Sequence, residues 1–162
     1  MKPPLNIKSS DDYQTPPEAL EPLYPFLPKD WTIWECAVGN GNLYNAFTER
    51  GYNCTWSDII SLDDNGKPED FLTCEPHECD CIVTNPPYSL KQQFLERAYE
   101  LGKPFAFLLP LTTFETAKRQ NLFKKHGLEV IFFDKRISFE TPNKTTGGGS
   151  WFATAWFTWK LN

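Results

Sequence analysis

Short apolar runs alternate along the chain with longer segments in which apolar positions repeat at helical spacing. The runs predict strands at residues 31–36, 52–57, 80–84, 105–109, 128–133 and 151–160, with a further short strand near 70–72. Helices are predicted at 42–50, 89–102 and 113–126, two of them followed by a glycine. Strands separated by such helices predict right-handed crossovers, and therefore an α/β fold with a doubly wound, mostly parallel sheet. The last two strands have no helix between them, so the C-terminal strand is expected to be antiparallel.

Helix-capping side chains predict where three of the helices begin. The segment Thr15-Pro16-Pro17-Glu18 combines a capping box with a proline at the first helical position, and it predicts a helix that Pro22 should kink. Ser89 is predicted to cap the helix at 89–102. Thr112, with Glu115 three residues later, is predicted to open the helix that ends at His126.

Length and composition place the chain among globular proteins. Its 162 residues, 40% of them hydrophobic, fit one domain spanning residues 1–162. No apolar run is long enough to cross a membrane, and the N-terminus lacks the apolar core of a signal peptide. The five cysteines are odd in number and have no disulfide-framework spacing. We therefore expect a cytoplasmic protein that does not act at a membrane.

Charge is distributed unevenly along the chain. The net charge is −5, but residues 1–80 carry five Lys/Arg and fifteen Asp/Glu, whereas residues 81–162 carry eleven and six. Such asymmetry in a chain indicates a polyanionic partner. The basic residues from Lys118 to Lys125 have a simpler interpretation, the solvent-exposed face of a helix.

The most informative motif is Asn85-Pro86-Pro87-Tyr88, which follows an apolar strand. Two prolines end that strand, and proline holds the residue before it in extended geometry, so the direction of Asn85 is largely fixed. Oxygen acceptors beside an aromatic ring suit a planar group that carries an NH2. The alternative is an ordinary Pro-Pro turn with a surface tyrosine.

Three acids and a glycine turn lie at the ends of, or within, other predicted strands. Glu35, Gly39 and Gly41 come at the end of the first predicted strand, where glycines allow close approach of a ligand and a carboxylate can hold an ammonium or a hydroxyl. Asp58 ends the second strand, where an acid commonly accepts from ribose hydroxyls. Asp70, at the short third strand, could accept from an adenine amino group.

In chain order these features resemble the S-adenosylmethionine-dependent amino-methyltransferases, most closely the DNA N6-adenine methyltransferases. The resemblance covers nearly the whole chain, and Asn85-Pro86-Pro87-Tyr88 resembles the catalytic tetrapeptide of that family. It implies a Rossmann-like methyltransferase sheet, S-adenosyl-L-methionine as cofactor, and transfer of a methyl group to the N6 amino group of adenine.

The remaining motifs carry the resemblance along the chain. Thr15 and Pro16 resemble the N-terminal cofactor-binding segment of the family. The cofactor loop of the family is matched by Glu35, Ala37, Gly39 and Gly41. The acids that take the cofactor's ribose and adenine are matched by Asp58 and by Asp70 with Phe71. Arg136 and Phe139 resemble the later motif, in which an aromatic ring can stack on the target base.

The resemblance also implies a mechanism and a partner. Acceptors at the Asn85 side chain and the Pro86 carbonyl would hold the two amino hydrogens of the base while Tyr88 stacks on it. Many relatives carry a separate target-recognition domain, which 162 residues leave no room for. The segment Lys135–Ser150 is then the candidate recognition surface, unless a homodimer partner or a separate subunit supplies specificity.

Other functions stay open at this point. The same tetrapeptide could act on an RNA base, on cytosine N4 or on a protein glutamine, and DNA is the expected partner with RNA as the first alternative. A non-catalytic methyltransferase-fold subunit is the alternative outside enzymes. Cys74, His77, Cys79 and Cys81 superficially resemble a metal cluster, but alternation along one strand favours buried thiols, and we predict no metal site.

Overall fold

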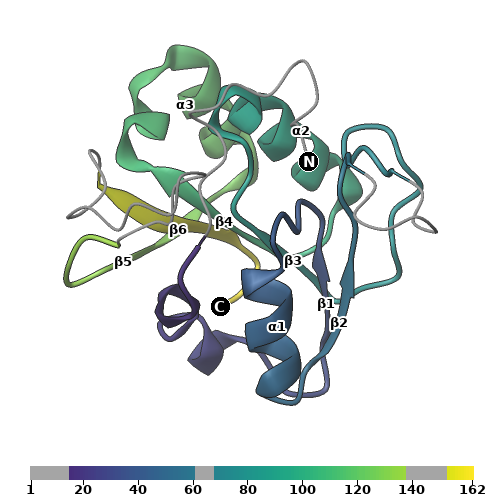
Figure 1. The fold of residues 1–162 in the computed structure, drawn as a ribbon. Helices are drawn as coiled ribbons and strands as arrows, with labels where there is room; N and C mark the ends of the chain where they lie inside the picture. Colours follow the sequence, from purple (N-terminus) through teal and green to yellow (C-terminus); the bar gives the residue numbers. More distant parts are fainter. Residues whose placement is uncertain (1–14, 61–67, 138–152) are drawn as a thin grey trace.

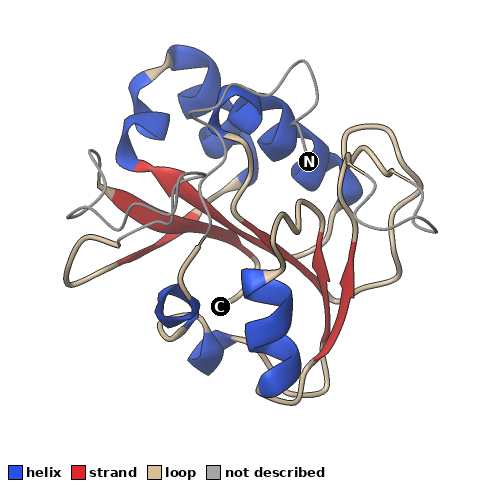
Figure 2. Ribbon diagram, viewed as in Figure 1, coloured by secondary structure: helices blue, strands red, loops and turns tan. Residues whose placement is uncertain are grey.

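Six strands form one sheet in the computed structural model, which describes residues 15–60, 68–137 and 153–162 (Figure 2). The sheet has the order β2-β1-β3-β4-β6-β5. Strands β1 to β4 pair in parallel, whereas β6 is antiparallel to both of its neighbours, β4 and β5. This confirms the predicted fold class. The strands are β1 Thr32–Glu35, β2 Asn53–Trp56, β3 Cys81–Thr84, β4 Phe105–Pro110, β5 Glu129–Phe132 and β6 Thr154–Trp159.

Helices cover both faces of this sheet (Figure 1). On one face lie α1, Asn42–Glu49, and two short 3-10 helices, Pro17–Leu20 and Tyr24–Phe26. On the other face lie α2, Lys91–Leu101, and α3, Ala117–His126. Two more 3-10 helices, Tyr88–Leu90 and Leu111–Glu115, follow β3 and β4. Coverage of both faces explains why every residue of β3 and β4 is buried.

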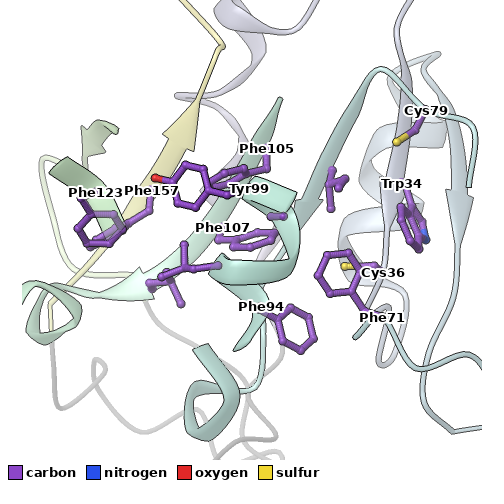
Figure 3. Close-up of a cluster of buried hydrophobic side chains, with 14 of the residues drawn as sticks. Trp34, Cys36, Phe71, Cys79, Phe94, Tyr99, Phe105, Phe107, Phe123 and Phe157 are labelled. Carbon is purple, nitrogen blue, oxygen red and sulfur yellow. The ribbon is translucent and has the colours of Figure 1, made fainter. Parts of the chain in front are cut away.

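Each face of the sheet has its own hydrophobic core. Leu20, Leu23 and Phe47 pack beneath α1 with Trp156 of β6, whose indole Nε1 donates to the carbonyl of Ala19 at 2.7 Å. The opposite core, below α2 and α3, is mostly aromatic (Figure 3); it includes Trp34, Phe71, Phe94, Phe105, Phe107, Phe123 and Phe157. Together the two cores hold the central strands in register, which fixes where each strand ends.

The first predicted helix is wrong in type. Pro17 does occupy the first helical position, but the segment forms two 3-10 turns, and the Thr15 side chain makes no capping bond. Pro22 and the prolines after it lack the N–H groups that a continuing α-helix needs, so the segment cannot extend beyond short turns. The segment still packs against the core, since Leu20, Leu23 and Leu27 are buried.

The predicted strand near 70–72 is a turn. The carbonyl of Asp70 accepts from the backbone N–H groups of Thr73 and Cys74, and its side chain accepts from the N–H of Leu72 at 3.0 Å. Aspartate competes with strand geometry in this way, by bonding to the backbone two residues ahead. Phe71 supplied the apolar signal, because its ring is buried in the aromatic core.

Two predicted helix caps are also wrong. Ser89 lies inside a 3-10 turn, and α2 begins at Lys91 without a side-chain cap. Thr112 lies in the 3-10 helix after β4, whereas Thr116 caps α3 by accepting from the backbone N–H of Arg119. Thr116 caps α3 in place of Thr112 because residues 111–115 form a 3-10 helix before α3 begins.

Candidate functional site

The sheet reverses its order between β1 and β3. From β1 the chain passes outward to β2 on one side, while β3 leads to β4 on the other. In open α/β sheets the loops that leave two such strands diverge and open a crevice at their carboxyl ends. Glu35 ends β1 and Thr84 ends β3, so the predicted glycine turn and the Asn-Pro-Pro-Tyr segment both start at this crevice.

Glu35 is the central acid of the site. Its side chain is buried, and Oε1 accepts hydrogen bonds from the Thr84 hydroxyl and from the backbone N–H of Ala37, the latter at 3.0 Å. Burial raises the pKa of the carboxyl to about 8, against the two hydrogen bonds and with a contribution from the negative charge of Asp58. A buried carboxyl whose pKa lies close to neutral pH can lose its proton when a cation approaches.

The loop after β1 is a tight turn held by a second acid. Gly39 and Gly41 have φ angles of 55° and 87°, a conformation that disfavours other residues. The Gly39 N–H donates to Asp58 Oδ2 at 2.9 Å, and the N–H of Ile60 donates to Oδ1 at 3.0 Å. Asp58 therefore fixes the loops that leave β1 and β2 relative to each other.

The predicted N-terminal segment lies beside this loop. Thr15 is buried, and its carbonyl accepts from the side chain of Asn42, the first residue of α1, at 2.9 Å. Pro16 immediately precedes the first 3-10 helix. This contact places Thr15, with Pro16 next to it, beside the glycine turn; their contact with a cofactor stays a prediction.

The Asn-Pro-Pro-Tyr segment leaves the sheet directly from β3. Pro86 is buried and Pro87 is extended, with φ −60° and ψ 124°, so the segment is a rigid link between β3 and α2. Tyr88 is partly buried against the aromatic core, and its carbonyl accepts from Lys91 Nζ at 3.0 Å. Asn85 is half-buried at the crevice end of β3.

Asp70 and Phe71 lie on the neighbouring loop. Arg97 of α2 donates to the carbonyl of Cys74 at 2.9 Å and fixes this turn against the helix. Phe71 is 2% exposed, and its ring centroid lies 4.8 Å from that of Phe94. In this structure Phe71 is a core residue, and its contact with a cofactor stays a prediction, as does that of Asp70.

The basic residues of the C-terminal half divide between two edges of the sheet. Because β5 runs parallel to β4, the end of α3 lies at the edge opposite the crevice. Lys124, Lys125 and His126 form that last helical turn, where cations favour the helix dipole. Arg136 follows the carboxyl end of β5 and is exposed on the same side of the sheet as the crevice, with β4 and β6 between β5 and β3. Phe139, the other predicted substrate-binding residue, lies outside the described residues.

The cysteine-rich segment serves packing and hydrogen bonding. His77 stacks on Trp34, with ring centroids 4.6 Å apart, and its ring nitrogens bond to Thr55 and Glu69. Cys79 and Cys81 are buried, and burial raises the pKa of both thiols. Across the described ranges, no group of three or more His, Cys, Asp or Glu side chains is arranged to hold a metal ion.

Two residues of the site had no signal that we recognised in the sequence. Thr84 directly precedes Asn85, and an alternating strand pattern does not distinguish its hydroxyl from a buried methyl group. The sequence indicates Asn42 only as the start of a helix and gives no sign of its contact with Thr15. Their contacts join residues 49 and 27 positions apart, which only the pairing of the strands could reveal.

The fold is similar to that of S-adenosylmethionine-dependent methyltransferases of known structure. The chain is similar to the 23S rRNA methyltransferase ErmE, with a TM-score of 0.58 and 18% identity over 87% of this chain and 65% of that one. A TehB-like methyltransferase from Corynebacterium glutamicum gives 0.54 and 16% over 90% and 88%. The glycopeptide N-methyltransferase MtfA gives 0.54 and 12% over 95% and 90%.

No protein-family model and no curated protein matches the sequence, so the likeness is one of fold. Among the described helices, none combines the length and the apolar character that a membrane span requires.

Proposed function

We propose that this chain transfers a methyl group from S-adenosyl-L-methionine to the exocyclic N6 amino group of adenine in DNA. The observation that carries the proposal is the hydrogen bond from Thr84 to Glu35. It joins the strand that leads into the glycine turn to the strand that leads into Asn85, so a cofactor loop and a base-binding segment share one crevice.

The residues present fit the proposed cofactor. S-adenosyl-L-methionine carries an ammonium, two ribose hydroxyls and an electrophilic methyl group on a sulfonium, which is the reactive group it supplies when bound. Glu35 offers a buried carboxyl to a cation or hydroxyl, and the glycine turn offers close backbone approach. Asp58 is half-buried at the adjoining strand end, within reach of the same loop.

Asn85 and Pro86 would act on the amino group itself. The nitrogen of an exocyclic amine is a poor nucleophile because its lone pair is delocalised into the ring. Oxygen acceptors at the Asn85 side chain and the Pro86 carbonyl would hold both hydrogens and favour a tetrahedral nitrogen. The rigid prolines keep these acceptors in place, so alignment contributes most of the catalysis.

Tyr88 would hold the base by stacking on its face. A base in duplex DNA must first be flipped out of the helix, which costs about a few kcal/mol. Stacking and the two amino-group bonds would offset that cost at the crevice.

A nucleic-acid substrate is supported by charge at this edge. Lys135 and Arg136 are exposed after the carboxyl end of β5, on the same side of the sheet as the loops that follow β1 and β3, with β4 and β6 in between. RNA is the second candidate, because the chain is similar in fold to an rRNA methyltransferase. A homodimer partner or a separate recognition subunit would supply target specificity in either case.

The test is methyl transfer from labelled S-adenosyl-L-methionine to unmethylated duplex DNA, single-stranded DNA, RNA and protein extract, followed by hydrolysis to identify the modified atom. N6-methyladenine in DNA is the expected product. Label in RNA or protein instead would keep the crevice chemistry and replace the substrate. Cofactor bound without transfer to any of the four would indicate a missing recognition subunit, and no cofactor binding would overturn the proposal in favour of a non-catalytic subunit.

A further inference from the structure

Thr84 is a buried hydroxyl placed between two functional loops. Its side chain is 0% exposed, and it donates to Oε1 of Glu35 across the β1–β3 pair. The next residue in the chain is Asn85, and a β-branched side chain such as threonine has restricted χ1 freedom. A displacement of Thr84 is therefore passed directly to the backbone that carries Asn85.

The carboxyl of Glu35 is held from two sides. The backbone N–H of Ala37, in the loop that follows Glu35, donates to Oε1 at 3.0 Å. The hydroxyl of Thr84, in β3, donates to the same oxygen. One carboxyl oxygen is thus hydrogen-bonded both to the loop after β1 and to the last residue of β3, which leads into Asn85. A ligand that draws the Glu35 carboxyl toward the glycine turn must change, or be resisted by, the bond to Thr84.

We propose that Thr84 is a positioning residue that couples the cofactor loop to Asn85 through Glu35, so that cofactor binding improves the placement of the base. This inference rests on the proposed function, because it takes Glu35 as a cofactor-binding residue. The Thr84 hydroxyl is buried and donates to Glu35, so it would act only through Glu35 and the adjoining Asn85.

The coupling has a signature in pH. The hydrogen bond from Thr84 favours the ionised form of Glu35 and opposes the effect of burial on its pKa. Loss of the hydroxyl therefore raises the pKa of Glu35 further. If the ionised carboxyl binds a cationic ligand, the pH at which binding becomes strong moves upward.

The chain offers a closely matched control on the far side of the sheet. Thr158 of β6 is 1% exposed and donates to Oε1 of Glu129 at 3.1 Å. It pairs with Ala106 at the start of β4, at the edge opposite the crevice. Thr158→Val removes the same kind of bond, from a buried strand threonine to a glutamate, without touching the site.

The experiment compares wild type with Thr84→Val, Thr84→Ser and Thr158→Val. Binding of S-adenosyl-L-methionine is measured by calorimetry across pH, and transfer to unmethylated duplex DNA is measured in single turnovers at saturating cofactor. We expect Thr84→Val to lower cofactor affinity and the saturated rate each on the order of tenfold, and to move the binding profile to higher pH. Thr84→Ser should stay within about threefold of wild type because it keeps the hydroxyl.

Three results would overturn the coupling. Thr84→Val could behave like Thr158→Val in affinity, rate and pH profile, which would show a purely structural threonine. It could lose affinity while keeping its rate at saturation, which would show that Asn85 is placed independently of the bond. A wild-type chain that binds no cofactor at any pH would overturn the proposed function, and the coupling with it, whereas the first two results leave the proposed function intact.

Discussion

The backbone N–H of Gly39 donates a hydrogen bond of 2.9 Å to Oδ2 of Asp58, and this bond ties the turn after β1 to the end of β2. The other oxygen of the same carboxylate accepts from the N–H of Ile60 at 3.0 Å. A carboxylate suits this position because it has only acceptors, and both of its neighbours are donors. Asp58 thus shapes the turn after β1, which we propose as the cofactor loop.

We predict that Asp58→Asn weakens cofactor binding by about tenfold or more, since a carboxamide must turn an NH2 group toward one of the two backbone donors. Calorimetric titration with S-adenosyl-L-methionine measures the change. Asp80→Asn is the control, because Asp80 Oδ2 accepts from the backbone N–H of Thr32 at 2.8 Å, at the opposite end of β1. Equal affinity losses in the two variants would place the effect in general stability.

Glu35 leads to a prediction about stability and pH. Its pKa in the folded chain, about 8, lies above the ordinary value of 4.5 because the carboxyl is buried. The folded state therefore holds this proton more tightly than the unfolded state, and the free energy of unfolding falls as pH rises from about 4.5 to about 8. Glu35→Gln removes this titration while keeping an oxygen acceptor for Thr84 and Ala37.

We predict that the stability of Glu35→Gln relative to wild type increases between about pH 5 and about pH 8 by on the order of a few kcal/mol. Urea unfolding at the two pH values measures it. Burial also raises the pKa of Cys36 and Cys81, but these thiols are the same in both chains, so their contribution cancels in the comparison. A difference that is independent of pH would show that Glu35 is already ionised in the folded protein.

Asn85 should separate catalysis from cofactor binding. We predict that Asn85→Ala abolishes methyl transfer, with cofactor affinity within about threefold of wild type, because its side chain would serve the base and not the cofactor. Transfer of labelled methyl groups and calorimetric binding are measured on the same preparation. Asn121→Ala, on the exposed side of α3, controls for the substitution itself. A large loss of cofactor binding in Asn85→Ala would assign this residue to the cofactor site.

Tyr88 should act through its ring. We predict that Tyr88→Ala raises the KM for the nucleic acid by about tenfold, whereas Tyr88→Phe changes it by less than about threefold, because stacking depends on the ring more than on the hydroxyl. Steady-state kinetics on the substrate identified by the methyl-transfer assay distinguish the two. Similar damage from both variants would mean that the hydroxyl matters and that stacking is not the main role.

Local patterns in the sequence predicted most elements, and long-range contacts were beyond them. The strand ending at Thr84 and the helix from Asn42 were predicted closely, because burial on both faces and a glycine boundary leave clear local signals. The segment after Pro17 was predicted as an α-helix because its apolar spacing is helical, although its prolines permit only 3-10 turns. Phe71 gave a strand signal from a buried turn.

The site was predicted unevenly for the same reason. Glu35 ends one strand, and Asp58 and Asn85 follow two others, so a parallel sheet places all three at one edge whatever the strand order. The strand order itself, which puts β1 beside β3, does not follow from local pattern. The bond between Thr84 and Glu35 depends on that order and could not be predicted without it.

The glycine turn allows a test that separates backbone strain from function. Gly41 has a φ angle of 87°, and a Cβ added there would meet only the side chain of Asn45, at 3.5 Å, so Gly41→Ala introduces strain without a clash. Gly102, which caps α2 with a φ of 70° and nothing within 4 Å of an added Cβ, gives the same strain away from the crevice. Both alanine variants should lose about 1–2 kcal/mol of unfolding free energy, measured by urea denaturation. Only Gly41→Ala should also weaken binding of S-adenosyl-L-methionine, because relaxation of the strain would move the loop that Asp58 holds. Equal binding in the two variants would exclude this turn from the cofactor site.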